Sequence, residues 1–181
     1  MRPRRWLGLL LALPLLMGGT FDRGLVIELE LDSFALRVRD VQRSVQGPEF
    51  PIVTGSPAHP TPTGRFRAHS VVHNPSWEPG YTARRLGGEP IPASMDGPLG
   101  VGKIGFAADG IALHGGAHPL LLGKPASLGC VRALDVDFAR LVEWLEGQDA
   151  LLPSRPQSDG ERHQAFRRPI QVVVRGEARR P

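Results

Sequence analysis

Alternation of apolar and polar residues near the start of the chain predicts a pair of β-strands. The segment 25–31 reads LVIELEL, and the segment 34–41 reads FALRVRDV. A period of two places every second side chain on the same face of a strand. Asp32 and Ser33 lie between the two segments and favour a turn. We therefore expect a hairpin of two strands, each with one buried face.

Short apolar segments separated by glycine and proline follow this hairpin. Strands are expected at 50–54, 65–72, 99–106, 110–113 and 170–174, where apolar and β-branched residues gather. The PTPTG sequence at 60–64 is incompatible with a helix and predicts a rigid turn. The stretch 74–98 is rich in glycine and proline and predicts a long irregular excursion, a kind of loop that is often functional or disordered.

One segment follows a helical period instead. Its apolar residues recur at spacings of three and four, as Phe138, Leu141, Val142 and Leu145, which is typical of the buried face of a helix. Asp135 is expected to cap this helix, and Gly147 to lie near its end. The 18 prolines and 22 glycines of the chain lie mostly outside any helical period. The pattern therefore predicts a mainly β fold with one helix.

The length of the chain favours one working domain. A chain of 181 residues can bury one substantial hydrophobic core and is short for two. The domain is expected over residues 21–176. Within it, the polar and arginine-rich segment 153–169 predicts a loop insert, and residues 177–181 predict a frayed tail.

Residues 1–20 carry the features of an export signal. Three arginines, at positions 2, 4 and 5, precede an apolar stretch at 6–17, the arrangement of a secretory signal peptide. This stretch is shorter than the roughly 20 residues that span a bilayer. Because no Ala-x-Ala cleavage site follows it, an uncleaved membrane anchor is the alternative. Either reading places the domain in the periplasm or elsewhere outside the cytoplasm.

The charge balance indicates a surface attracted to polyanions. The chain has 22 Lys and Arg residues against 18 Asp and Glu residues, a net charge of +4. Peptidoglycan and lipid headgroups are suitable partners for such a surface. The sequence has no basic run interleaved with aromatic residues and no zinc-finger spacing, so nucleic acid is not expected as a partner.

The single cysteine, Cys130, is the first indication of chemistry. Exported proteins that use cysteine structurally use it in pairs, so an unpaired one is either an apolar filler of the core or a reactive thiol. It lies in the sequence SLGCVR at 127–132, and an earlier stretch, 113–116, reads LHGG. A nucleophilic thiol requires a nearby base, and His114 is the candidate.

Neighbouring residues complete the predicted site. Gly129 allows a sharp turn, so that the amides of Gly129 and Cys130 could hold an oxyanion. Arg132 would point the same way as Cys130 in an extended segment, where it could favour a thiolate or bind a substrate carboxylate. Ser127 and Gly115 are assigned to the same substrate-binding and oxyanion group, although turn geometry explains them nearly as well.

Other interpretations of these residues remain open. His114 could be a hydrogen-bonded histidine at a strand end, and Arg132 could be an ion-pair partner of Asp135 or Asp137. A zinc site formed by His114, His118 and Cys130 is a further alternative, but paired histidine ligands at a spacing of four usually lie on a helix. The glycines at 115 and 116 exclude a helix there, and no metal is expected.

The ordered motifs resemble the YkuD-type L,D-transpeptidase catalytic domain. Cys130 follows His114 by 16 positions and lies in a Ser-x-Gly-Cys-Val-Arg sequence. The resemblance extends through the segments 53–55, 60–66 and 74–77 and covers roughly 25–174. It implies a β-sandwich with one helix packed near the active site. Leu128 is a departure, because the family often has a histidine before the motif glycine.

The resemblance also implies an activity that requires no cofactor. Cys130 would attack a peptidoglycan tetrapeptide stem at diaminopimelate, form a thioester and pass it to an amine. A second stem would give a 3-3 crosslink, and a wall-anchored protein is an alternative acceptor. Water as the acceptor would give an L,D-carboxypeptidase or endopeptidase. Leu128 leaves open a catalytically silent module that only binds the wall.

Overall fold

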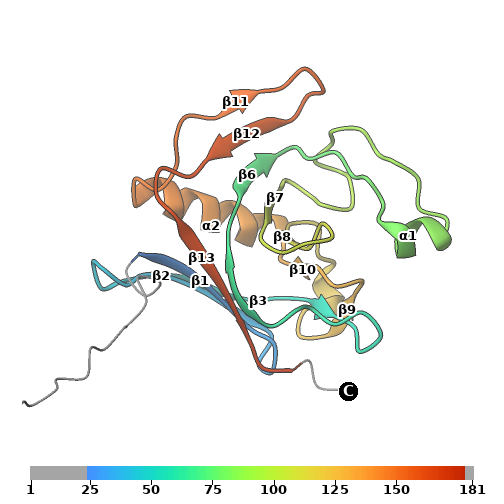
Figure 1. The fold of residues 1–181 in the computed structure, drawn as a ribbon, viewed down its shortest axis with the longest axis horizontal. Helices are drawn as coiled ribbons and strands as arrows, with labels where there is room; N and C mark the ends of the chain where they lie inside the picture. Colours follow the sequence, from blue (N-terminus) through green and yellow to red (C-terminus); the bar gives the residue numbers. More distant parts are fainter. Residues whose placement is uncertain (1–23, 178–181) are drawn as a thin grey trace, which may run out of the picture.

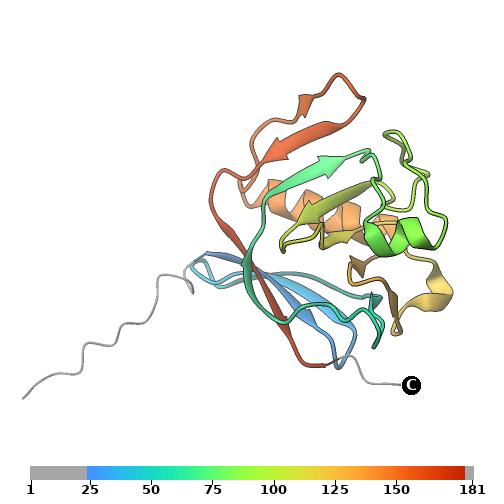
Figure 2. The ribbon, with the colours of Figure 1, turned by 45° about the vertical axis from the view of Figure 1, so that its right-hand side comes forward.

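The computed structural model describes residues 24–177 and shows a mainly β protein. Two sheets and one long helix surround a shared hydrophobic core. The predicted fold class is therefore confirmed. Figures 1 and 2 show the excursion with its short helix projecting beside the second sheet, on the side away from the N-terminal hairpin.

The first sheet contains the N-terminal hairpin and the C-terminal strand. Its order is β3-β2-β1-β13-β5, with bounds β1 Leu25–Glu30, β2 Ala35–Asp40, β3 Val45–Pro51, β5 Gly64–Arg67 and β13 Ile170–Arg175. Strand β1 pairs antiparallel with β2 and parallel with β13. The turn between β1 and β2 includes Asp32 and Ser33, so the predicted hairpin is confirmed.

The second sheet carries the residues of the predicted site. Its order is β10-β8-β7-β6-β12-β11, with bounds β6 Ser70–His73, β7 Gly102–Gly105, β8 Ala112–His114, β10 Val131–Arg132, β11 Arg155–Pro156 and β12 Arg162–Ala165. A separate two-stranded ladder joins β4, Thr54–Gly55, to β9, Pro125–Ser127. Ile104 of β7 and Leu113 of β8 are fully buried.

Two of the expected strands are each divided in the structure. The segment 65–72 is two strands in different sheets, because the chain crosses from β5 to β6 at the buried Ala68. The segment 50–54 contributes its start to β3 and its end to β4. Local pattern does not reveal such crossings, since apolar residues continue on both sides of the crossing.

The predicted helix is present as α2, Asp135–Gly147, with its four predicted apolar residues buried. It packs against β3 and β7. Gly102 permits the close approach to β7, since a Cβ there would lie 2.6 Å from the ring of Phe138. The predicted cap is wrong. Leu134 occupies the N-cap position without a side-chain capping bond, and Asp135 is the first residue of the helix itself.

The arginine-rich segment 153–169 is a β-hairpin and not an irregular loop. Strands β11 and β12 pair antiparallel, and β12 joins the second sheet by pairing with β6. The sequence RHQA of β12 lacks an apolar period, but its backbone bonds to β6 do not depend on apolar side chains. Gln164 is buried and bonded to His73 and Glu146.

The excursion 74–98 contains a short helix, α1, Tyr81–Arg85. A second short helix, the 3-10 helix η2 Pro119–Leu121, lies between β8 and β9. The predicted export signal, residues 1–20, and all of the predicted tail except Glu177 lie outside the described residues. Within residues 24–177, no helix is both long enough and apolar enough to cross a membrane.

Candidate active site

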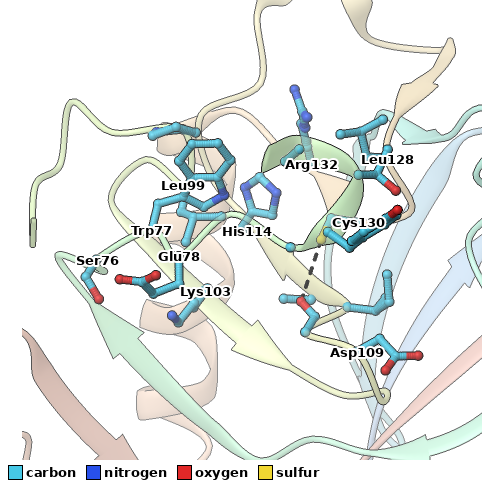
Figure 3. Close-up of a pocket in the computed structure, with 18 residues that line it drawn as sticks. Ser76, Trp77, Glu78, Leu99, Lys103, Asp109, His114, Leu128, Cys130 and Arg132 are labelled. Carbon is cyan, nitrogen blue, oxygen red and sulfur yellow. Dashed lines mark hydrogen bonds between the residues drawn. The ribbon is translucent and has the colours of Figure 1, made fainter. Parts of the chain in front are cut away.

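Pairing of β8 with β10 brings the two predicted catalytic residues to one place. The strands run parallel, with Val131 opposite Leu113 and Arg132 opposite His114. Cys130 immediately precedes β10. Its side chain and that of His114 line the same pocket, which has a volume of about 760 Å³ (Figure 3). Two segments separated along the sequence therefore contribute to one site.

His114 is held in a defined tautomer on the floor of this pocket. Its side chain is only 2% exposed, and its Nδ1 lies 2.7 Å from the carbonyl oxygen of Gly115. Because a carbonyl oxygen can only accept, Nδ1 carries the proton and Nε2 keeps a lone pair. Burial, together with the positive charge of Arg132, lowers the pKa of His114 to about 4. At neutral pH the imidazole is uncharged and can accept a proton.

Cys130 is partly buried, and its thiol points toward the β7–β8 turn. The Sγ atom lies 3.8 Å from the carbonyl oxygen of Gly110, the contact drawn as a dashed line in Figure 3. Burial raises the pKa of the thiol more than the Ala112 amide and Arg132 lower it. The resting site is thus a neutral thiol with a neutral imidazole. This differs from the thiolate that the sequence suggested Arg132 would favour.

The loop before Cys130 is held by Ser127. Its hydroxyl accepts from the Gly129 amide at 3.1 Å and donates to the Cys130 carbonyl at 2.5 Å. Gly129 has a φ of +115°, which favours glycine at this turn. Because the Gly129 amide already donates to Ser127, this amide is not free to bind an oxyanion in the resting geometry. Ser127 acts here as a turn residue.

Thr61 also supports this loop, a role that the PTPTG turn pattern did not predict. Its buried hydroxyl donates to the Gly129 carbonyl at 2.9 Å and accepts from the Gly55 amide at 2.9 Å. The turn is therefore joined to the cysteine loop through a single side chain. The rigid proline-threonine pattern was the only sequence signal for this contact.

Asp135 is a second residue whose contribution the sequence did not predict. Its Oδ1 accepts from the amides of Val101 and Gly116, each at 2.9 Å. A Cβ at Gly115 would lie 2.2 Å from the same oxygen, so only glycine allows this approach. The Gly115 amide donates to Gly102, and the Gly115 carbonyl accepts from His114. Gly115 therefore orients the histidine and has its own amide engaged.

Arg132 lines the pocket together with a second cation, Lys103. Among residues 24–177, Arg132 forms no ion pair with Asp135 or Asp137: Asp135 accepts backbone amides, and Asp137 lies 3.5 Å from Arg140. Within the described part of the chain, the Nε atom of Arg132 is buried without a hydrogen-bond partner. Figure 3 shows Arg132 and Lys103 on either side of His114.

The other side of the pocket is formed by the excursion. Trp77 and Glu78 line it from this side (Figure 3), and Tyr81 also belongs to the lining. Leu128, at the position of the family's histidine, also lines the pocket and is 41% exposed. The departure from the family motif thus places an apolar side chain at the pocket rim.

The zinc alternative has no ligand set to support it. Between residues 24 and 177, no group of three or more His, Cys, Asp or Glu side chains is placed to hold a metal ion. His118, one of the ligands considered, has its Nδ1 3.3 Å from the amide of Leu120.

Comparison with known proteins identifies the family. The model of the YkuD family, the L,D-transpeptidase catalytic domain, matches residues 26–172. The chain belongs to this family. No curated protein matches it.

Solved structures share the fold at low sequence identity. L,D-transpeptidase 3 from Mycobacterium tuberculosis matches with a TM-score of 0.55 at 16% identity, over 84% of this chain and 61% of its own. The structure of the same protein with a faropenem-derived adduct matches with a TM-score of 0.53 at 15% identity, over 84% of this chain and 60% of its own. An L,D-transpeptidase from Mycobacterium smegmatis matches with a TM-score of 0.50 at 17% identity, over 84% of this chain and 58% of its own. This chain therefore spans about three fifths of their length.

Proposed function

We propose that this protein is an extracytoplasmic L,D-transpeptidase that uses Cys130 as its nucleophile and His114 as its base. The observation that carries the proposal is the placement of His114. Its Nδ1 is committed to Gly115, its low pKa keeps it neutral, and it shares a pocket with Cys130. A neutral imidazole with a free Nε2 is the form that can take a proton from a thiol.

The first half-reaction forms a thioester. The acyl donor is a peptidoglycan tetrapeptide stem, and the carbonyl attacked belongs to the L-centre of diaminopimelate. His114 Nε2 takes the Sγ proton as sulfur attacks, and the tetrahedral oxyanion forms beside the Cys130 amide. Collapse of this intermediate breaks the bond to the terminal D-alanine. The departing amine takes the proton from His114, which returns the imidazole to its neutral form.

The second half-reaction transfers the acyl group. An acceptor amine, the side-chain amine of a second stem's diaminopimelate, attacks the thioester carbonyl while His114 Nε2 removes its proton. The carbon–sulfur bond breaks, and the thiolate regains that proton. The product is a 3-3 crosslink, and neither half-reaction requires a metal or an organic cofactor. An export signal or anchor at residues 1–20 would deliver the domain to the wall.

The test is incubation of the purified protein with disaccharide-tetrapeptide, followed by measurement of D-alanine release and of product masses. We expect released D-alanine together with a crosslinked dimer, and neither product with Cys130→Ser. Release of D-alanine with only a trimmed stem would assign water as the acceptor. Continued release by Cys130→Ser would contradict the proposal, because a different nucleophile would then perform the reaction.

A further inference from the structure

The pocket wall, defined here as residues 76–83, has one buried residue, Pro79, and otherwise little apolar packing to hold it. It supplies Trp77 and Tyr81 to the pocket. Yet no residue from 80 to 99 is buried, and Tyr81 is 76% exposed. The neck of the excursion is closed by two backbone bonds between Trp77 and Ile91, at 2.8 and 2.9 Å. These bonds lie within the loop and stabilise its shape. They do not attach the loop to the rest of the domain.

A buried carboxylate on the β11–β12 hairpin makes a polar contact at the base of this wall. Glu161 is only 6% exposed. Its Oε1 accepts from the amide of Ser76 at 2.8 Å and from the Ser76 hydroxyl at 2.7 Å. Its Oε2 lies 2.6 Å from Nε2 of His163. The first residue of the wall is therefore bound twice by one carboxylate oxygen.

The charge of this carboxylate is secure under ordinary conditions. Burial alone would raise the pKa of Glu161, but hydrogen bonds from His163 and Ser76 outweigh burial and lower it to about 2. Hydrogen bonds to an ionised acceptor are stronger than those between neutral groups. Glu161 is therefore ionised at neutral pH, and it holds Ser76 through charge-assisted hydrogen bonds.

The hairpin that carries Glu161 is itself fixed to the rest of the domain. Gln164 bonds to His73 at 2.8 Å and to Glu146 of α2 at 3.0 Å. The Asn74 side chain donates to the Gly160 carbonyl at 3.0 Å. The hairpin therefore connects the excursion to α2. Glu161 itself does not line the pocket.

We propose that Glu161 is a positioning residue that fixes the pocket wall, so that Trp77 and Tyr81 meet the peptide of the acyl donor. This inference rests on the proposed function. An extended stem peptide reaches beyond the reacting carbonyl and contacts the wall. A small acylating agent such as a carbapenem reaches Cys130 with far less of that contact. Loss of Glu161 should therefore weaken binding of the peptide donor and leave the chemistry of Cys130 and His114 intact.

The test compares kinetics of the full-length protein with two acyl donors. For Glu161→Ala we expect a KM for tetrapeptide raised about tenfold, with kcat and the rate of carbapenem acylation each changed less than about threefold. Glu161→Gln keeps an acceptor for Ser76 and should stay within about threefold of the wild type in KM. His163→Ala is the matched control, because it removes the partner of Glu161 that lies outside the wall. Its KM should likewise stay within about threefold of the wild type.

Hydrogen exchange of the excursion provides an independent measurement. Amides at 76–91 should exchange faster in Glu161→Ala than in the wild type and in His163→Ala, since the anchor of the wall is lost. Should Glu161→Ala fail to fold, Ser76→Ala removes one of the two bonds and should raise exchange and KM in the same direction by a smaller factor.

Failure of each claim has a separate signature. A wild-type protein that releases no D-alanine would contradict the proposed function, while the exchange comparison would still decide the role of Glu161. Unchanged exchange at 76–91 in Glu161→Ala would overturn the positioning role. An equal loss of tetrapeptide turnover and carbapenem acylation would also overturn it, because that pattern indicates general damage.

Discussion

The two sides of the pocket are built in different ways. The floor comes from β8 and β10, whose pairing places His114 beside the cysteine loop. There, Leu113, His114 and Val131 are at most 2% exposed. The wall has a single buried residue, Pro79, and its first residue, Ser76, donates two hydrogen bonds to Glu161 on the β11–β12 hairpin. The proposed reacting groups thus occupy a rigid frame, and the proposed contacts with the peptide lie on a segment that can change independently.

Changes in the floor should have the largest effects, beginning with His114. For His114→Ala we expect acylation of Cys130 to slow by roughly a hundredfold to ten-thousandfold, the usual contribution of a positioned base. Stopped-flow measurement with a carbapenem gives the rate. Added imidazole should restore part of it in this variant and none in the wild type. A rate within about threefold of the wild type would remove His114 from the mechanism.

The pH dependence of acylation tests whether the resting pair is neutral. The pKa of His114 is lowered to about 4, so the base is protonated only as pH falls through that value. The pKa of the Cys130 thiol is raised by burial, so a thiolate should not accumulate at neutral pH. The rate should therefore fall about tenfold per pH unit below roughly pH 4 and stay level at neutral pH. A lower limb near the ordinary histidine pKa of about 6.5 would contradict this account.

Asp135 connects the floor to the first turn of α2. Asp135→Ala leaves the amides of Val101 and Gly116 without their acceptor, which should lower the free energy of unfolding by roughly 1–3 kcal/mol. Asp135→Asn keeps an oxygen at this position and should lose less. Urea unfolding of the three proteins gives the comparison. Equal stability of the alanine variant and the wild type would show that water replaces the carboxylate.

Leu128 lies at the rim, where the smallest effect is expected. Leu128→His restores the residue that the family often has. Because we propose His114 as the base and Leu128 is 41% exposed, the rate of carbapenem acylation should change less than about threefold. A gain of a hundredfold would show that this chain lacks an essential group and would favour the silent wall-binding alternative.

The same contrast explains what the sequence revealed. Strong periodicity predicted the N-terminal hairpin and the buried face of α2, because burial on one face leaves a repeating local pattern. His114 and Cys130 were identified as a pair from their chemistry and from the family's motif order. The parallel pairing of β8 and β10 that joins them is a long-range property of the chain, which no local pattern records.

The features that the sequence missed are polar and depend on distant partners. The RHQA segment of β12 has no apolar period, and its pairing with β6 comes from backbone bonds. Helix α1 has only five residues, too few to show a period. Asp135 was predicted to cap α2 because acidic residues favour helix starts. Only the folded arrangement shows that its carboxylate instead serves Val101 and Gly116.

Mass measurement of the intact protein after exposure to a carbapenem tests the central claim most directly. We expect one acyl adduct per chain, located at Cys130 by peptide mapping and absent from a folded Cys130→Ser variant. An adduct that persists in that variant, or a wild-type protein that remains unmodified, would contradict an acyl transfer centred on this thiol.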